Sequence, residues 1–382
     1  MLGKYAQTCP VHFGRGAVAA LGGIVKDLGA TRVLVVTDQG VAATEGYARA
    51  LDSLESAGLA VTEFTKVIAD PPDSTVDEGG ALARAAGIDG IVAIGGGSPM
   101  DAAKAINVLV HNDGPVNAYL GNPFYKPGVP LVMVPTTSGT GSENTSVGVV
   151  TDTAKGIKSA VIGNATAAVV DPEMTLGVPP AVTANTGMDV LAQAAESLTS
   201  KARNPMSTVL AADAVRRVVR WLPVAVEDGA DYRAREELAI ASNFTGIAFN
   251  DALVHLGHAI AHTLGAKFHL THGTLCALAL PEVMKYAATA VPDRVRLVAE
   301  AAGVALADGD DDAAAGEKLA AAFRAFSRSL GIPSLAALGV DRRALLALAP
   351  AVTEDACYAF APREMTVAEI EAVLAAIYDN YR

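Results

Sequence analysis

The chain has 382 residues, a formal net charge of −12 and no basic cluster, which argues against nucleic acid or an anionic membrane surface as a partner. It is 51% hydrophobic, yet Gly, Pro or a charged residue interrupts every apolar run before the ~18 residues that a membrane-spanning helix needs. The three cysteines, Cys9, Cys276 and Cys357, are widely spaced without a CxxC pair, and the segment Met1–Thr8 lacks a signal-peptide pattern. These features predict a cytoplasmic protein with reduced thiols, long enough for two domains.

The pattern of apolar residues changes along the chain. In residues 1–180, short β-branched runs alternate with helical patterns, which is the rhythm of a parallel βαβ sheet. The expected buried strands are 32–37, 91–94, 131–134 and 167–170. In residues 181–382 strand signals nearly vanish, and long Ala- and Leu-rich periodic segments predict helices. We therefore predict an α/β N-terminal domain with a Rossmann-like parallel sheet (1–180) and an all-α C-terminal domain (181–382), divided at the two prolines 179–180 because neither can continue a preceding helix.

Asp38 stands at the end of the first predicted strand. A carboxylate there could accept hydrogen bonds from an adenosine ribose and would repel the 2′-phosphate of NADP. As a lone residue, Asp38 is equally well explained as the cap of a following helix.

A run of three glycines follows the second strand. Gly95, Gly96 and Gly97 lead into Ser98 and Pro99, where we expect a helix to begin with an N-cap residue and a proline at its first position. Glycines let backbone amides approach a pyrophosphate, and a helix N-terminus adds partial positive charge. The spacing is neither GxGxxG nor the P-loop pattern, so a tight structural turn explains this motif equally well.

A second polar loop, Pro-Thr-Thr-Ser-Gly-Thr-Gly-Ser-Glu over residues 135–143, follows the third strand. It lies where ligands bind in open α/β sheets, at the carboxyl ends of the strands. An ordinary capping role for its Ser and Thr residues is the alternative, and the density of hydroxyl groups disfavours it.

Three polar residues share one face of a predicted helix that opens the second half. Asp189 and Gln193 are four residues apart, and Glu196 follows Asp189 by seven residues on the same stripe. An Asp near a helix N-terminus also interacts favourably with the helix dipole, which would explain Asp189 alone.

Five of the seven histidines fall between positions 255 and 272. At about 100° per residue, His255, His258 and His262 occupy one stripe of a helix. Gly265 would then allow a turn that brings His272 back toward that stripe. Converging neutral imidazoles suit a divalent metal, Fe²⁺ or Zn²⁺, and the stripe outweighs the alternative of histidines packed in a core.

Together these motifs resemble the iron-containing (group III) alcohol dehydrogenase family, within the dehydroquinate synthase-like superfamily. The resemblance rests on the glycine loop 95–104, the polar loop 136–143, Asp-Pro at 171–172, Gly-Met-Asp at 187–189 and the histidines at 258, 262 and 272, in order and with the expected spacing. It implies a dinucleotide-binding α/β domain and a helical domain, with substrate and metal in the cleft between them. It also implies NAD as cofactor, with NADP as the alternative, and a divalent metal, Fe²⁺ as the first candidate and Zn²⁺ as the second.

The resemblance assigns roles to residues of this chain. The implied metal ligands are Asp189, Gln193, His258 and His272, and His262 is the implied catalytic residue, associated with proton movement. The implied cofactor-binding residues are Asp38, Gly95, Gly96, Gly97, Ser98, Asp101, Thr136, Thr137, Ser138, Thr140 and Lys158.

Gln193 departs from the family pattern, which usually has a histidine at this position. An amide oxygen is a harder and generally weaker ligand than imidazole. Gln193 could bind the metal through its oxygen, the metal could keep three protein ligands as in related glycerol dehydrogenases, or the site could be vacant. His255 is a second departure and could supply a compensating nitrogen, although its place on the helix points more to the pocket wall.

The resemblance therefore implies a metal-dependent, NAD(P)-linked alcohol dehydrogenase or aldehyde reductase for a small primary alcohol or aldehyde. One carboxylate and neutral ligands leave a divalent site with a net charge near +1, which stabilises the alkoxide that develops as hydride arrives. His262 would move the proton. The expected partners are the small substrate and further copies of the chain, as a homodimer or larger homo-oligomer, with no nucleic acid and no membrane.

Two other functions stay open. A metal-independent reductase similar to maleylacetate reductase is favoured by the missing histidine, but the retained Asp189 argues against it. A binding or regulatory protein that keeps the nucleotide cleft without chemistry is the third interpretation, and the intact glycine and polar loops beside three metal ligands argue against it.

Overall fold

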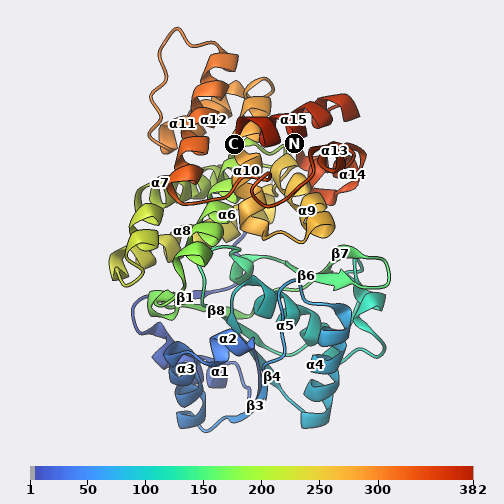
Figure 1. The fold of residues 1–382 in the computed structure, drawn as a ribbon. Helices are drawn as coiled ribbons and strands as arrows, with labels where there is room; N and C mark the ends of the chain where they lie inside the picture. The colour runs from blue at the N-terminus through green and yellow to red at the C-terminus, as the bar shows by residue number, and fades with distance from the viewer. Residues whose placement is uncertain (1–4, 382) are drawn as a thin grey trace. The chain divides into compact units, whose positions relative to one another are not determined.

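The computed structural model describes residues 5–381. The first four residues of the N-terminal segment 1–8, which lacks a signal-peptide pattern, therefore lie outside the described residues. The chain divides into two compact units, an α/β unit of residues 7–177 and a helical unit that runs from Val178 onward and includes Tyr5 and Ala6. The predicted fold class is confirmed, because the first unit contains a parallel sheet with helices and the regular elements described in the second are helices (Figure 1).

The α/β unit is built on a six-stranded sheet in which all neighbouring strands are parallel, in the order β1-β8-β5-β4-β2-β3. Its strands are β1 (Val11–Phe13), β2 (Arg32–Val36), β3 (Ala60–Phe64), β4 (Gly90–Gly95), β5 (Leu131–Pro135) and β8 (Ala167–Val170). The four predicted strands are β2, β4, β5 and β8, whose continuous apolar runs fit strands covered on both faces. The edge strands β1 and β3 escaped prediction because they are only partly buried and carry weaker apolar patterns.

Two layers of helices cover this sheet. The helical segments are η1 (Ala17–Ala20), α1 (Leu21–Asp27), α2 (Gln39–Ala42), α3 (Glu45–Ser56), α4 (Asp73–Ala86), α5 (Gly97–Val110), η2 (Val116–Tyr119), η3 (Ser142–Asn144) and η4 (Pro172–Thr175). Helices α1 and α3 share a core with one face of the sheet, whereas α5 packs on the opposite face with α4 beside it (Figure 1). A separate antiparallel hairpin, β6 (Val147–Asp152) and β7 (Ile157–Ile162), follows the polar loop.

The register of the sheet places the predicted loops at one edge. In the pairing of β2 with β4, Val36 lies opposite Ala93, and in the pairing of β4 with β5, Gly95 lies opposite Pro135. Because these three parallel strands are neighbours, Asp38, the glycine loop and the polar loop all leave the sheet at its carboxyl edge, where ligands bind in open α/β sheets.

The helical unit is organised around one buried helix. Its helices are α6 (Pro180–Thr199), α7 (Pro205–Glu227), α8 (Tyr232–Ala252), α9 (Leu256–Phe268), α10 (His272–Ala288), α11 (Pro292–Ala301), α12 (Asp312–Ser329), α13 (Arg342–Leu346), α14 (Ala349–Glu354), η5 (Ala356–Phe360) and α15 (Val367–Asn380). Helix α6 contacts α7, α8, α9, α10 and α11, and all of its residues from Gly187 to Thr199 are buried. Polar side chains on this stretch of α6 therefore face protein on every side.

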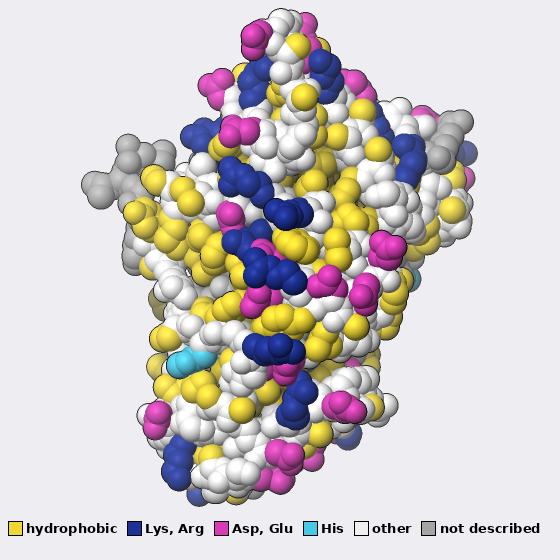
Figure 2. All heavy atoms as spheres, turned by 90° about the vertical axis from the view of Figure 1, so that its left-hand side faces the viewer, with side chains coloured by type: hydrophobic (Ala, Val, Ile, Leu, Met, Phe, Trp, Pro, Cys, Tyr) yellow, Lys and Arg dark blue, Asp and Glu magenta, His cyan; other side chains and the backbone are white. Residues whose placement is uncertain are grey.

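Charged side chains of both signs lie on the face shown in Figure 2, where Lys and Arg form a row with Asp and Glu between and beside them. Within residues 5–381, no helix combines the length and the apolar character needed to cross a membrane.

Lys104 ties helix α5 to the segment after the polar loop. Lys104 is 1% exposed, and four oxygens lie within hydrogen-bonding distance of its Nζ: Ser142 O (2.7 Å), Ser142 Oγ (2.9 Å), Thr145 Oγ1 (2.9 Å) and Val147 O (2.7 Å). They offer more than enough acceptors for the three N–H groups of the ammonium. Burial lowers the pKa of Lys104 to about 8, although Asp101 acts in the opposite direction. A buried ammonium group is tolerated only when it is fully hydrogen-bonded, and this one is.

We expect Lys104→Met to lower the free energy of unfolding of the α/β unit by about 3 kcal/mol, because the buried oxygens around Nζ lose their donor. Lys66→Met is the matched control, since Lys66 is 63% exposed and pairs only with the exposed Glu78. It should change stability by less than about 1 kcal/mol. Urea denaturation followed by circular dichroism measures both, and equal losses in the two variants would contradict the assignment of Lys104 as a structural tie.

Candidate active site

The glycine loop and the polar loop pack directly against each other. A Cβ atom at Gly97 would lie 2.6 Å from Thr140 Cγ2, and one at Gly96 would lie 3.1 Å from Thr137 Oγ1. The requirement for glycine is therefore partly a packing requirement between two loops whose contacting residues are 41 and 43 positions apart in the sequence. The structure brings the glycine loop and the polar loop together, as the prediction that both bind the dinucleotide requires.

Helix α5 begins earlier than predicted. Its first residue is Gly97 and its N-cap is Gly96, so Ser98 and Pro99 lie inside the first turn and the prediction of Ser98 as N-cap is wrong. Gly96, which has an extended backbone, is the N-cap, and Ser98 is already the second residue of the helix. A glycine N-cap has no side chain to occupy the first-turn amides, an arrangement that favours an anionic ligand.

Several other predicted cofactor residues have partners within the protein. Asp38 caps α2 through a hydrogen bond that its Oδ1 accepts from Val41 N (2.9 Å), so the capping alternative holds for one carboxylate oxygen. Asp101 accepts a hydrogen bond from Ser142 Oγ (2.7 Å), and Lys158 Nζ lies 2.7 Å from Asp70 Oδ1. Their roles toward a dinucleotide stay predictions.

The remaining predicted cofactor residues lie in the loop after β5. Thr136 is buried, whereas Thr137, Ser138 and Thr140 are partly exposed. Ser138 Oγ is buried without a hydrogen-bond partner. A hydroxyl group in that state is suited to a ligand, because an unpaired buried polar atom costs free energy.

Asp189 is the centre of the polar cluster in the helical unit. It lies more than two turns inside α6 and is 3% exposed, so the explanation of Asp189 as a residue at a helix N-terminus is wrong. Its Oδ1 lies 3.5 Å from His258 Nε2 and 3.5 Å from His272 Nε2. Burial by itself would raise the pKa of Asp189, but His272 and His258 outweigh this effect and hold the pKa below its usual value.

The donor atoms of this cluster fit a divalent metal. Asp189 Oδ1 is buried and makes no hydrogen bond, and 3.5 Å is too long for one to either imidazole. Metal–ligand bonds of about 2.0–2.1 Å place neighbouring donors of a tetrahedral site about 3.4 Å apart. The observed separations agree with that spacing, so Asp189, His258 and His272 are placed as ligands are placed around a metal.

A second carboxylate on α6, Glu196, orients His258. Its Oε2 lies 2.5 Å from His258 Nδ1, and Oε1 accepts a hydrogen bond from Gly257 N (2.5 Å) at the first turn of α9. A Cβ atom at Gly257 would lie 2.9 Å from Glu196 Oε1, so the glycine permits this approach. Burial would raise the pKa of Glu196, but His255, His258 and the amide of Gly257 bring it to about 2. Carboxylate–histidine pairs of this kind fix the tautomer and aim of a metal ligand, here through Nε2.

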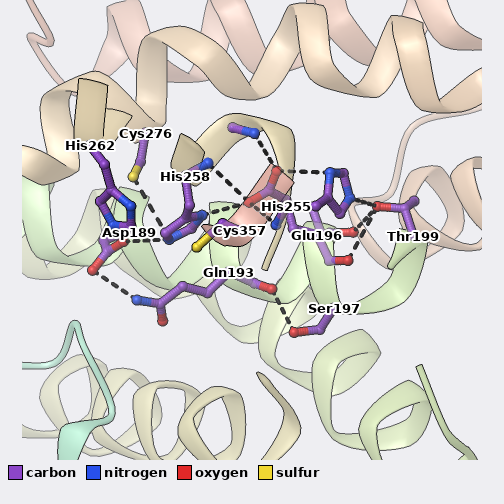
Figure 3. A network of polar contacts seen from close by, with 12 residues as sticks. Asp189, Gln193, Glu196, Ser197, Thr199, His255, His258, His262, Cys276 and Cys357 are labelled. Carbon is purple, nitrogen blue, oxygen red and sulfur yellow. Dashed lines mark hydrogen bonds and ion pairs between the residues drawn. The ribbon is translucent and has the colours of Figure 1, made fainter. Parts of the chain in front are cut away.

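His255 does not share the stripe of His258 and His262. It is the N-cap of α9, its Nε2 lies 2.8 Å from Thr199 Oγ1, and its Nδ1 lies 3.1 Å from Glu196 Oε1. The prediction that it belongs to the helical stripe is wrong because α9 begins only at Leu256, where Glu196 accepts hydrogen bonds from the first amides. His255 thus lies on the far side of Glu196 from the donor cluster (Figure 3).

The turn that returns the chain to the site also differs from the prediction. Helix α9 continues past Gly265 and ends at Phe268, and its C-cap His269 adopts the left-handed conformation (φ 55°). Three residues later, His272 starts α10. His269, a residue without a predicted role, is the pivot that places His272 beside His258.

Gln193 contacts Asp189 through its nitrogen. Nε2 donates a hydrogen bond of 2.9 Å to Asp189 Oδ2, and Oε1 is buried without a partner. In Figure 3 the amide nitrogen points toward Asp189 and the amide oxygen points away from the histidines. The opposite amide orientation would set two oxygens against each other, so the ionised carboxylate decides which atom faces it.

Sequence reasoning missed Cys276, which lies one helical turn after His272 on α10. Its Sγ lies 3.5 Å from His272 Nε2 and 3.9 Å from His258 Nε2, and it belongs to the same four-residue donor cluster as Asp189. Burial raises the pKa of its thiol to about 12. The spacing His-x-x-x-Cys was the available signal, because residues four apart share a helix face.

A second polar group lies next to the cluster. His262 Nδ1 lies 3.1 Å from Asp355 Oδ2, and the ring of His262 stacks on that of His272 with centroids 5.4 Å apart. Asp355, which sequence reasoning also missed, accepts a further hydrogen bond from Cys357 N. Burial would raise the pKa of Asp355, but His262 outweighs this effect and lowers it.

Comparison with known proteins identifies the family. Residues 10–172 match the family model "Iron-containing alcohol dehydrogenase", and residues 183–378 match the model of the C-terminal part of the Fe-containing alcohol dehydrogenases. The chain belongs to the iron-containing alcohol dehydrogenase family, as its motifs predicted.

Similar proteins have related activities in their names. The NAD-dependent methanol dehydrogenase of Bacillus methanolicus is 37% identical over 366 residues, which cover 94% of this chain and 96% of that protein. Lactaldehyde reductase of Escherichia coli is 34% identical, with 94% and 95% covered. A crystal structure of 1,3-propanediol oxidoreductase has a TM-score of 0.95 at 34% identity, covering 99% of this chain and 100% of the other. That of sulfoacetaldehyde reductase from Bifidobacterium kashiwanohense with NAD⁺ has a TM-score of 0.89 at 29% identity, covering 99% of each chain.

We expect Glu196→Gln to lower the free energy of unfolding by about 3 kcal/mol, because an amide offers one acceptor oxygen where several donors converge. Metal affinity should fall by about 10- to 100-fold, since His258 loses the carboxylate that aims it. The stability difference should shrink as pH falls from 4.5 toward about 2, because the depressed pKa of Glu196 stabilises the fold above its ordinary value of 4.5 and this contribution is lost on protonation.

Chemical denaturation at several pH values and metal titration measure these effects. Glu371→Gln, which alters an exposed carboxylate on α15, is the control. A Glu196→Gln protein with unchanged stability and metal affinity would remove the orienting role.

Proposed function

We propose that this enzyme is a metal-dependent, NAD-linked alcohol dehydrogenase or aldehyde reductase that acts on a small primary alcohol or aldehyde. The observation that carries the proposal is the buried Asp189 Oδ1, which accepts no hydrogen bond and faces two imidazole nitrogens 3.5 Å away, in a chain of this family. The names of its relatives, which include a methanol dehydrogenase, a lactaldehyde reductase and a 1,3-propanediol dehydrogenase, support the substrate class.

Each part of the chain has a separate task in this proposal. Asp189, His258 and His272 would hold the metal, and Glu196 keeps Nε2 of His258 turned toward it. The bound ion supplies Lewis acidity, which polarises a carbonyl oxygen. The glycine and polar loops would bind the dinucleotide, whose nicotinamide carries out the hydride chemistry.

His262 is the group that we propose for proton transfer. Its contact with the ionised Asp355 favours the tautomer with the proton on Nδ1, which leaves Nε2 free to accept one. The side chain is 29% exposed, so it can exchange protons with water. Asp355 is a positioning residue in this scheme, because it acts on the substrate only through His262.

Four finer points of the prediction go beyond the family assignment. We propose NAD over NADP, because the second oxygen of Asp38 stays available to a ribose hydroxyl after the first caps α2. The choice between iron and zinc depends on the complete ligand set. The homo-oligomeric state and the cytoplasmic location stay predictions from the sequence.

The metal-independent alternative is disfavoured by the same cluster. A reductase without metal has no use for a buried carboxylate whose oxygen lacks a hydrogen bond, since such an atom destabilises the fold by about 1–3 kcal/mol. Loss of turnover on chelation, with recovery on adding Fe²⁺ or Zn²⁺, is the outcome that the proposal requires. Unchanged turnover in thoroughly metal-free protein would overturn it.

We expect Asp189→Ala to lose metal and to lower kcat/KM with NADH and small aldehydes by orders of magnitude, while the protein stays folded. The reason is that the variant removes the carboxylate at the centre of the donor cluster. Metal analysis and steady-state kinetics over an aldehyde panel measure both effects, with Asp308→Ala, at an exposed loop position, as the control. Wild-type turnover and metal content in the variant would refute the metal site.

We expect the wild-type enzyme to prefer NADH over NADPH, and Asp38→Asn to narrow the preference by removing the charge that repels the 2′-phosphate. Asparagine caps a helix about as well as aspartate, so stability should hardly change. Asp38→Gly should narrow the preference similarly, at a cost of a few tenths of a kcal/mol. The ratio of kcat/KM for the two cofactors is the measurement, and a wild-type enzyme that already prefers NADPH would contradict the placement of Asp38 at the ribose.

A further inference from the structure

Four side chains from three helices present their donor atoms to one point. Asp189 comes from α6, His258 from α9, and His272 and Cys276 from α10, and their donor atoms all lie within 4.8 Å of one another. Cys276 is fully buried. Burial alone says little, since cysteine often packs as a small hydrophobic residue. What distinguishes this cysteine is the chemistry of its neighbours.

The separations match the edges of a coordination polyhedron. A tetrahedral site with metal–nitrogen bonds of about 2.1 Å and a metal–sulfur bond of about 2.3 Å has nitrogen–sulfur edges of about 3.6 Å. Cys276 Sγ lies 3.5 Å from His272 Nε2 and 3.9 Å from His258 Nε2. With the two 3.5 Å separations from Asp189 Oδ1, four of the six edges are close to the values of a real site.

Gln193 stands at the sequence position where the family usually has a fourth metal ligand, and its amide contacts Asp189. Gln193 donates its amide hydrogen to Asp189 Oδ2, which fixes the amide so that nitrogen, a poor metal ligand, faces the carboxylate. By holding Oδ2, Gln193 leaves Oδ1 as the oxygen that faces the histidines. Its contact is thus with a ligand and not with the metal.

We propose that Cys276, as a thiolate, is the fourth protein ligand of the metal, and that Gln193 is a positioning residue that holds Asp189. The inference rests on the metal-dependent function proposed above and deepens it. On metal binding the thiol proton passes to solvent and a metal–sulfur bond forms, with no change of oxidation state. Two anionic ligands then make a divalent site neutral, and the softer sulfur donor shifts selectivity toward Zn²⁺ over Fe²⁺.

X-ray absorption at the zinc edge of the Zn²⁺-loaded protein tests this ligand set. We expect one sulfur neighbour at about 2.3 Å beside nitrogen and oxygen at about 2.0–2.2 Å. In Cys276→Ser the sulfur neighbour should be lost. If that variant folds poorly, Cys276→Ala replaces it in the test, and its spectrum should also lack the sulfur neighbour. Cys9→Ser is the matched control and should keep the sulfur neighbour, because Cys9 belongs to neither of the two groups of clustered metal-donor side chains in the described residues.

The rate of metal loss to a chelator separates ligand from positioning residue. Cys276→Ser should lose Zn²⁺ at least about 10-fold faster than the wild-type protein and lack sulfur in its spectrum. Gln193→Ala should also lose the ion faster, by about 10- to 100-fold, but keep the sulfur neighbour.

Zinc bound without sulfur, or sulfur that persists in Cys276→Ser, would overturn the assignment of Cys276 while leaving the metal-dependent function intact. A wild-type chain that binds no divalent metal at all would instead overturn the proposed function on which the assignment rests.

Discussion

The site depends on two carboxylates that helix α6 buries in the middle of the helical unit. Asp189 and Glu196 are 3% and 1% exposed, and an ionised carboxylate at such a position is tolerated only with compensating donors or positive charge. Glu196 obtains them from backbone amides at the start of α9 and from His258. Asp189 obtains one hydrogen bond from Gln193, and its other oxygen faces two imidazoles. The metal ion that we propose would supply the positive charge that this second oxygen faces.

His258 links the two carboxylates. Its Nδ1 contacts Glu196 and its Nε2 faces Asp189, so the ring is held from both sides before a ligand arrives. A site held in this way needs little reorganisation on metal binding, which keeps its geometry and its charge fixed. In the proposed site, the same helix thus supplies one ligand, Asp189, and the group that orients another, Glu196, and the two are seven residues apart.

The α/β unit uses packing to shape its part of the enzyme. Positions 96 and 97 leave little room for a Cβ atom, because the polar loop lies against them. Lys104 anchors helix α5, which begins at Gly97. The first-turn amides of α5 therefore stay free of side-chain caps, while the buried ammonium group of Lys104 lies more than one turn along the helix. A phosphate-binding loop requires backbone amides without other partners at the helix N-terminus, and a helix that is held rigidly.

The sequence by itself determined the fold class and the family, and it predicted the residues that we propose around the metal, because strand runs, glycine loops and histidine spacing are local patterns. It could not determine what depends on contacts between helices. Glu196 caps α9, and this places His255 outside the predicted stripe. The turn expected at Gly265 occurs instead at His269, which adopts the left-handed conformation. The charge of Asp189 fixes the orientation of the Gln193 amide. Cys276 and Asp355 joined the site for the same reason. A cysteine four residues after a histidine, or an aspartate 93 positions from His262, acquires meaning only when folding brings its side chain within a few ångströms of the ring.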